Sequence, residues 1–237
     1  MRVALFIPCF VDLLAPRVGV ATARLLAHLG HEVVYPSDQT CCGQPALNAG
    51  RVEDAACLAR RLCDVLEAAA PDVVVAPSGS CVAALRIEGP ARLGLDHEVL
   101  GRLRELSEFL VEHDTIDLDA CFPARVTWHD GCHALRELGV GDGPRALLGA
   151  VEALELVELP NAQECCGFGG TFAVKAPAVS AGMGTRKVEA IEATGADFVA
   201  STEPSCLLQI DGLLRRRRTR IHTVHLAEIL VARGATR

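Results

Sequence analysis

The chain has 237 residues, of which 50% are hydrophobic and 22% charged, and its formal net charge is −7. This composition is typical of a globular protein and excludes a disordered or fibrous chain. The acidic balance argues against a nucleic-acid partner. Every apolar run is shorter than the ~18 residues of a membrane-spanning helix, so we expect no transmembrane segment.

In the first half of the chain, β-branched runs alternate with longer segments of helical periodicity. Runs at 3–7, 32–35 and 72–76 predict strands, and segments at 18–29 and 52–66 predict helices. We interpret the first run as a strand and not a signal peptide, because it is short and no small-residue cleavage site follows it. The order β-α-β-α-β predicts a mostly parallel sheet with helices on its faces.

The second half repeats this order. Strands are predicted near 125–128, 154–159 and 197–201, and helices near 145–152, 178–193 and 205–217. We therefore predict an α/β fold of two tandem duplicated units, each a mostly parallel sheet flanked by helices and related by a pseudo-twofold. The first unit is placed at 1–120 and the second at 121–237, with the boundary within 115–124, where Asp-rich sequence and Pro123 separate the two units.

Eight of the eleven cysteines form two sets in the same register. Cys9 and Cys132 are 123 positions apart, and Cys81 and Cys206 are 125 apart. Each cysteine follows a predicted strand, and the carboxyl ends of parallel strands meet at one edge of a sheet. We therefore expect each set to surround one metal centre. The first set is Cys9, Cys41, Cys42 and Cys81, and the second is Cys132, Cys165, Cys166 and Cys206.

Because we expect neither a signal peptide nor a membrane span, we expect a cytoplasmic chain, in which thiols stay reduced and many cysteines indicate metal binding or redox catalysis. Zinc usually takes its ligands from two close pairs, which neither set contains. Iron–sulfur clusters accept thiolates from separate loops, so we expect one or two clusters, of the four-iron type, with zinc as the alternative.

Glycines follow both cysteine pairs. We count Gly43, Gly167 and Gly169 as cofactor-binding residues, because adjacent ligands force a sharp turn that a side chain would crowd. The run at 165–170 could instead cradle a phosphate, but it lacks the full dinucleotide fingerprint.

Other polar residues are weaker candidates, and no catalytic residue is assigned. His129 and His133, beside Cys132, are candidate proton donors or modulators of a cluster, with a structural role as the alternative. Lys175 is a candidate contact for an anion, or an ordinary surface lysine. The three remaining cysteines are expected to be buried small hydrophobic residues: Cys57, Cys63 and Cys121.

The Cys-Cys-Gly repeats with distant flanking cysteines resemble the cysteine-rich CCG domain of heterodisulfide reductases and of the iron–sulfur subunits of glycolate and glycerol-3-phosphate oxidation systems. The blocks at 41–45 and 165–172 are most similar to the lactate-utilisation members of this family, and the similarity spans essentially the whole chain.

This resemblance implies an iron–sulfur electron-transfer subunit of a multi-subunit system that oxidises L-lactate, or a related 2-hydroxy acid, to the 2-oxo acid. It implies as partners a ferredoxin-like iron–sulfur subunit and a further subunit of the lactate-utilisation complex, through which peripheral membrane contact would occur. Whether the chain alone is an enzyme stays open.

The sequence departs from the heterodisulfide reductases at one position of each repeat. The downstream element in those proteins is Cys-x-x-Cys, whereas Ser78 and Glu203 occupy its first position here. Four thiolates per set remain, enough for an ordinary four-iron cluster. Ser78 and Glu203 are either oxygen ligands or hydrogen-bonding loop residues. A heterodisulfide-type thiol–disulfide reductase subunit and a zinc-stabilised binding module are the alternative functions.

Overall fold

The chain divides into two compact units, Met1–Asp114 and Thr115–Arg237. The computed structural model describes residues 1–113 and 119–234. The predicted boundary between residues 120 and 121 stays a prediction, and residues 114–118 beside it lie outside the described part.

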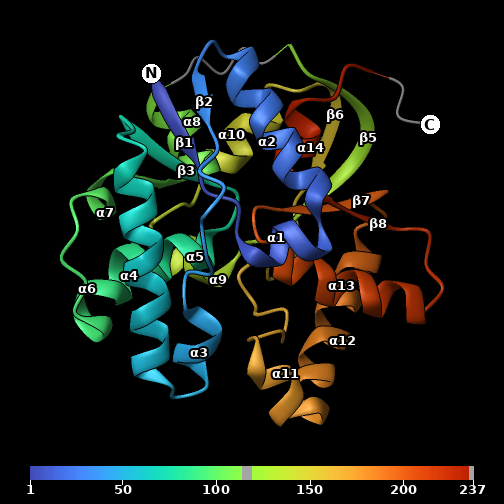
Figure 1. Ribbon diagram of the computed structural model, residues 1–237. Helices are drawn as coiled ribbons and strands as arrows, with labels where there is room; N and C mark the ends of the chain where they lie inside the picture. The colour runs from blue at the N-terminus through green and yellow to red at the C-terminus, as the bar shows by residue number, and fades with distance from the viewer. Residues whose placement is uncertain (114–118, 235–237) are drawn as a thin grey trace. The chain divides into compact units, whose positions relative to one another are not determined.

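Unit 1 contains a four-stranded parallel sheet with the strand order β2-β1-β3-β4 (Figure 1). The strands are β1 (Arg2–Leu5), β2 (Glu32–Val34), β3 (Val73–Ala76) and β4 (Leu103–Glu105). The helices are α1 (Cys9–Leu14), α2 (Pro16–His28), α3 (Gln44–Asn48), α4 (Val52–Ala68), α5 (Gly79–Ala83), the π-helix η1 (Ala84–Glu88), α6 (Gly89–Leu93), α7 (Val99–Arg102) and α8 (Leu106–His113).

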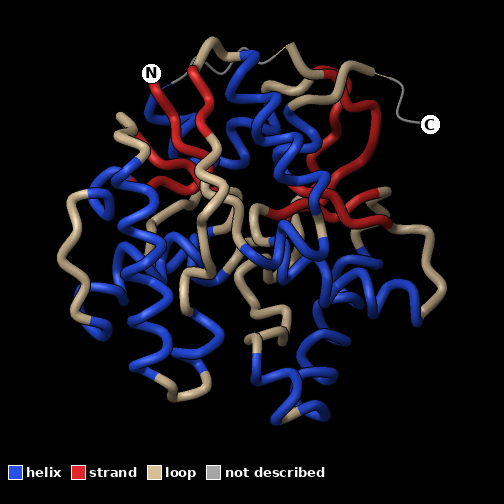
Figure 2. Tube along the Cα trace, viewed as in Figure 1, coloured by secondary structure: helices blue, strands red, loops and turns tan. Residues whose placement is uncertain are grey.

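Unit 2 contains a second four-stranded parallel sheet, with the order β6-β5-β7-β8. The strands are β5 (Cys121–Trp128), β6 (Glu152–Val157), β7 (Phe198–Ser201) and β8 (His222–His225). The helices are α9 (Cys132–Arg136), α10 (Gly143–Gly149), α11 (Thr171–Lys175), α12 (Pro177–Ala193), α13 (Pro204–Arg216) and α14 (Leu226–Leu230). Within each unit, helices flank the strands (Figure 2).

The two sheets have the same topology, since in each the first strand lies between the second and the third and the fourth follows the third. A hydrogen bond from a backbone N–H to an aspartate carboxylate is also repeated in the two units. The N–H of Arg2 donates to the Asp72 carboxylate at 2.7 Å, and the N–H of Arg125 donates to the Asp197 carboxylate at 3.0 Å. The predicted fold of tandem duplicated α/β units is confirmed.

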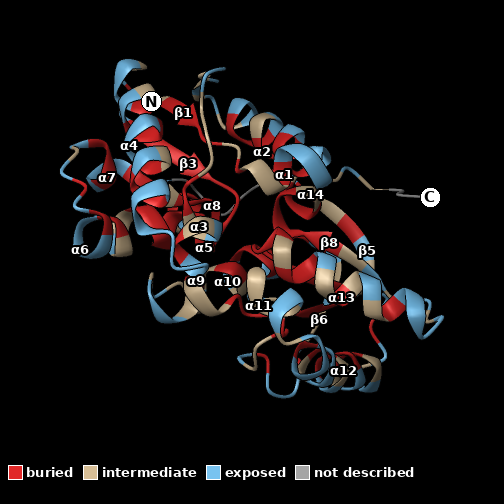
Figure 3. Ribbon diagram, turned by 60° about the horizontal axis from the view of Figure 1, so that its bottom comes forward, coloured by how far each residue is buried: buried red, intermediate tan, exposed pale blue. Residues whose placement is uncertain are grey.

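Apolar residues on both faces of the central strands form the core of each unit. All four residues of β3 are buried, as a parallel strand covered on both faces requires. The long helix α4 is amphipathic: residues such as Leu62 and Leu66 are buried, while its other face is exposed (Figure 3). This packing leaves the carboxyl edge of each sheet for the loops that carry the cysteines.

No helix within the described residues is both long enough and apolar enough to cross a bilayer.

Candidate metal centres

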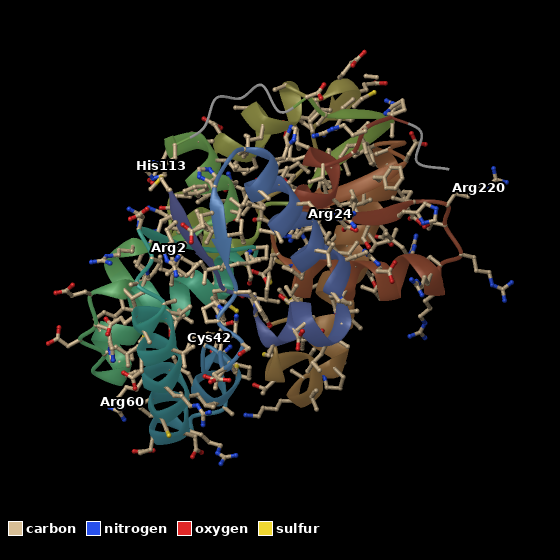
Figure 4. The ribbon with its side chains drawn as sticks, turned by 45° about the horizontal axis from the view of Figure 1, so that its top comes forward. Arg2, Arg24, Cys42, Arg60, His113 and Arg220 are labelled. Atoms are coloured by element: carbon tan, nitrogen blue, oxygen red, sulfur yellow. The ribbon has the colours of Figure 1, made fainter. Side chains whose placement is uncertain are left out.

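In unit 1, the four cysteines of the first set lie directly after the first three strands. Cys9 begins α1 after β1, and Cys81 lies in α5 after β3. Cys41 and Cys42 lie in the loop between β2 and α3; Figure 4 labels Cys42. The Sγ atoms of Cys9 and Cys41 are 3.5 Å apart, and those of Cys42 and Cys81 are 3.4 Å apart. The structure therefore brings these four thiols together at one edge of the sheet.

In unit 2, the second set has the same placement. Cys132 begins α9 after β5, Cys165 and Cys166 lie in the loop between β6 and α11, and Cys206 lies in α13 after β7. The Sγ atoms of Cys166 and Cys206 are 3.0 Å apart. Cys132 and Cys165 influence each other's ionisation, which raises the pKa of Cys132 and lowers that of Cys165. Cys166 and Cys206 also belong to the hydrophobic core of the unit.

In both sets, one pair of cysteines is buried and the other pair is partly exposed. Cys42 and Cys81 are buried in unit 1, as are Cys166 and Cys206 in unit 2. The partly exposed residues are Cys9, Cys41, Cys132 and Cys165. A group held by either set would thus have one side shielded from water and one side close to the surface.

The turn after each cysteine pair requires glycine. Gly43 has a φ of +87°, and a Cβ added there would lie 2.6 Å from the carbonyl oxygen of Ala55. Gly167 has a φ of +85°, and its added Cβ would lie 2.5 Å from the carbonyl oxygen of Ser180. Both distances are shorter than Cβ atoms show in proteins, and positive φ disfavours other residues. The two turns are therefore built alike.

The same turns direct a backbone N–H toward sulfur. The N–H of Gly43 donates to Sγ of Cys41, and the N–H of Gly167 donates to Sγ of Cys165, both at 3.4 Å. Gly169 also has positive φ, at +54°, and lies against the side chain of Phe172.

Hydrogen bonds between the thiols favour the thiolate form of Cys41 in unit 1 and of Cys165 and Cys206 in unit 2. The thiols of Cys42 and Cys9 lower the pKa of Cys41 to about 3. In unit 2, the thiols of Cys132 and Cys166 lower the pKa of Cys165 to about 2.

Cys9 and Cys166 show the opposite effect, because each has a partner that is already ionised. The pKa of Cys9 is raised by its bond to Cys41, and the pKa of Cys166 is raised by its bond to Cys165. Each set thus resists full ionisation until a cation neutralises the sulfur atoms, which is the behaviour of a metal site that releases protons on binding.

The donor atoms fit a thiolate-bound metal. All eleven cysteines are free thiols. Thiolates around one tetrahedral metal lie about 3.8 Å apart, because the metal–sulfur distance is ~2.3 Å. The sulfur separations of 3.0 to 3.5 Å are close to this value. Soft thiolates select zinc, copper(I) or iron–sulfur clusters.

Ser78 and Glu203 make hydrogen bonds within their own loops. Oγ of Ser78 lies 3.3 Å from Oγ of Ser80. Oε1 of Glu203 accepts a hydrogen bond of 2.9 Å from the hydroxyl of Ser205. Both residues are buried, and both precede the helix that carries the last cysteine of the set.

The three weak catalytic candidates lie in different surroundings. His129 is fully buried, and its ring lies with the sulfur atoms of Cys166 and Cys206 in one group whose ligand atoms are within 4.8 Å of one another. His133 is partly exposed on α9, with Nε2 3.8 Å from the Glu137 carboxylate. Lys175 is exposed at the end of α11. Of the three, the structure brings His129 to the sulfur atoms.

The remaining cysteines differ from one another. Cys63 is buried as predicted, but Cys57 is exposed, and that part of the prediction is wrong. Six residues along a helix correspond to a rotation of roughly 240°, so the two cysteines of α4 lie on different faces. Cys121, at the start of β5, is partly exposed and not buried as expected.

Lys187 is a residue near the second set that the sequence pattern did not indicate. Its side chain is 1% exposed on α12, and its ammonium group donates to the carbonyl oxygens of Asn161 at 2.8 Å and Ala162 at 3.2 Å. Those carbonyls belong to the loop that leads to Cys165 and Cys166. Burial lowers the pKa of Lys187, while the nearby carboxylate of Glu164 favours its charged form.

A buried ion pair supports the loop before Cys132. Asp130 is 5% exposed and accepts hydrogen bonds of 3.0 Å from both terminal nitrogens of Arg145. Nε1 of Trp128 donates to the same carboxylate at 2.7 Å. These contacts connect the end of β5 to α10.

Comparison with known proteins identifies the class of this fold and site. The sequence profile of the family described as "CCG: Cysteine-rich domain" matches residues 3–86 and 126–211, one match in each unit. The chain therefore belongs to the family of CCG cysteine-rich domain proteins, and the resemblance stated from its motifs is confirmed.

Two similar curated proteins share one name. The chain is 42% identical over 236 residues to "Lactate utilization protein A" of Exiguobacterium sp., a match covering 97% of this chain and 96% of that protein. It is 43% identical to the protein of the same name from Geobacillus kaustophilus, covering 99% of this chain and all of that protein.

Among solved structures, a hypothetical protein from Helicobacter pylori superposes on the whole chain with a TM-score of 0.65 and 11% sequence identity. The chain spans about half of that protein, 49% of its length. At this identity the likeness concerns the fold alone.

Proposed function

We propose that this chain is an iron–sulfur electron-transfer subunit of a multi-subunit system that oxidises L-lactate, or a related 2-hydroxy acid, to the 2-oxo acid. The observation that carries the proposal is the pair of four-cysteine sets at the carboxyl edges of two duplicated sheets. The substrate comes from the name that its full-length relatives share.

Each set would hold one cluster, of the four-iron type, through its four thiolates, and the cluster would supply one-electron transfer. Each thiolate would bind a different iron, so the sulfur atoms would have to move farther apart than the 3.0 to 3.5 Å that suits a single tetrahedral metal. Cys9, Cys41, Cys42 and Cys81 would hold the first, and Cys132, Cys165, Cys166 and Cys206 the second. The buried cysteines exclude water from one side of each centre, while the partly exposed cysteines leave the other side accessible to a redox partner.

The partners that this proposal requires are a ferredoxin-like iron–sulfur subunit and a further subunit of the same system, because electron transfer needs both a donor and an acceptor. Reduced thiols favour a cytoplasmic location for the chain. The free state of all eleven cysteines agrees with that setting.

Growth on L-lactate tests the function in the cell. A strain of the source organism that lacks this chain is expected to stop growing on L-lactate as sole carbon source, while its growth on pyruvate is unchanged. Wild-type chain supplied in trans should restore growth, whereas Cys42→Ser and Cys166→Ser chains should not, because each lacks a buried thiolate. Unimpaired growth of the deletion strain on L-lactate would contradict the proposed substrate.

A further inference from the structure

Phe6 and His129 occupy the same place in the two units. The backbone N–H of Phe6 donates to the carbonyl of Val75, and the N–H of His129 donates to the carbonyl of Ala200, both at 2.9 Å. Each residue lies three positions before the first cysteine of its set. Both side chains are 0% exposed. The first unit therefore has a buried phenyl ring at the position where the second unit has a buried imidazole.

The imidazole of His129 is directed to sulfur. Within residues 1–113 and 119–234, neither ring nitrogen has a hydrogen-bond partner. A buried donor without an acceptor costs about 1–3 kcal/mol. Nitrogen of His129 and the Sγ atoms of Cys166 and Cys206 lie within 4.8 Å of one another. The sulfur atoms are thus the acceptors that this ring meets.

Two further substitutions between the units introduce charges of opposite sign. Lys187 and Leu62 occupy the same position in α12 and α4, two helices of 17 residues each. Glu203 corresponds to Ser78, since each immediately precedes the helix that carries the last cysteine of its set. The charges of Lys187 and Glu203 act on the second set with opposite sign, whereas His129 lies within 4.8 Å of the sulfur atoms of Cys166 and Cys206.

We propose that His129 donates a hydrogen bond from its ring N–H to Sγ of Cys206 in the second metal centre and makes this centre easier to reduce. For its redox consequence the proposal rests on the proposed iron–sulfur function. A donor at the sulfur stabilises the extra negative charge of the reduced centre more than that of the oxidised one. One electron enters the centre, no bond is broken, and His129 keeps its proton. The two centres of the chain therefore differ in how easily they are reduced. His129 is a positioning residue of the second centre.

A redox titration of the holoprotein, followed by electron paramagnetic resonance, tests this role. In His129→Phe, which copies unit 1, the equilibrium constant for reduction of the second centre should fall about tenfold, or ~59 mV for one electron. The first centre should be unchanged. The control His222→Phe, at an exposed position on β8, should leave both centres unchanged. An intact second centre with an unaltered potential in His129→Phe would overturn the proposal.

If His129→Phe does not fold, the variant Phe6→His and the spectrum of the wild-type protein test the proposal instead. Phe6→His should make the first centre easier to reduce. Pulsed electron paramagnetic resonance of the wild-type second centre should show an exchangeable N–H proton near the cluster. A nitrogen coupling large enough for a direct iron ligand, or no exchangeable proton, would contradict the hydrogen bond.

If the proposed iron–sulfur function is wrong, the protein will contain neither iron nor acid-labile sulfide, a result that does not depend on His129. In that case Co²⁺ can be bound to the second set of a Cys42→Ser chain, in which the first set is incomplete. The sulfur-to-cobalt charge-transfer band should shift between this chain and the same chain with His129→Phe. Identical bands would overturn the role of His129 whatever metal the site holds.

Discussion

Gly167→Ala is expected to lose roughly 4 kcal/mol of stability and to empty the second metal centre. The replacement forces alanine into a φ of +85° and places its Cβ 2.5 Å from the carbonyl oxygen of Ser180. Positive φ and a backbone clash each cost about 1–3 kcal/mol. Because this turn carries Cys165 and Cys166, relief of the clash must displace both sulfur atoms. Urea unfolding and metal content measure the two effects.

Gly182→Ala is the matched control for this prediction. Gly182 lies in α12, the helix that also carries Ser180, and an added Cβ there meets no atom within 4 Å. Alanine in a helix interior is favoured over glycine by roughly 0.5–1 kcal/mol. This variant should therefore be slightly more stable and keep its metal. If both variants behaved alike, the assigned role of the turn would be wrong.

Asp130→Ala is expected to lose about 3–4 kcal/mol. Asp130 is 5% exposed, and its removal leaves the Trp128 N–H without its acceptor and Arg145 paired with the exposed carboxylate of Glu158. Breaking a buried ion pair from one side typically costs ~3–5 kcal/mol. The partial exposure of Arg145 places the expected value at the lower end of this range. Chemical denaturation of the metal-free chain measures the loss.

Glu155→Ala supplies the comparison for Asp130→Ala. Glu155 pairs with Arg125 at 3.1 Å, but both side chains are largely exposed. Exposed pairs contribute at most about 1 kcal/mol. A loss of stability in Asp130→Ala no larger than that in Glu155→Ala would show that the Trp128–Asp130–Arg145 contacts do not support the unit.

The sequence predicted the fold well where the elements were long or strongly apolar. The buried strand at 73–76 and the helices α4 and α12 appear within a few residues of their predicted bounds. The fourth strand of each sheet was missed. β4 has three residues, Leu-Arg-Glu, and β8 has four, His-Thr-Val-His. Such short polar runs lack the apolar pattern of a strand, and pairing with the third strand determines their conformation.

The gathering of the cysteines followed from topology, because loops at the carboxyl edge of a parallel sheet converge. The environment of the sulfur atoms did not follow from it. Nothing in the spacing distinguishes His129, which lies against two sulfur atoms, from His133, which lies at the surface. Lys187 was missed because a single lysine in a helical segment is ordinarily exposed, and its burial depends on carbonyl groups of a loop 25 residues away.

The content of iron and acid-labile sulfide in the chain, purified and reconstituted without oxygen, tests the central claim most directly. We expect roughly eight irons and eight sulfides per chain, four for each set of cysteines. Cys42→Ser and Cys166→Ser should each retain about half of both. A colourless chain that binds zinc, with neither iron nor sulfide after reconstitution, would contradict the account.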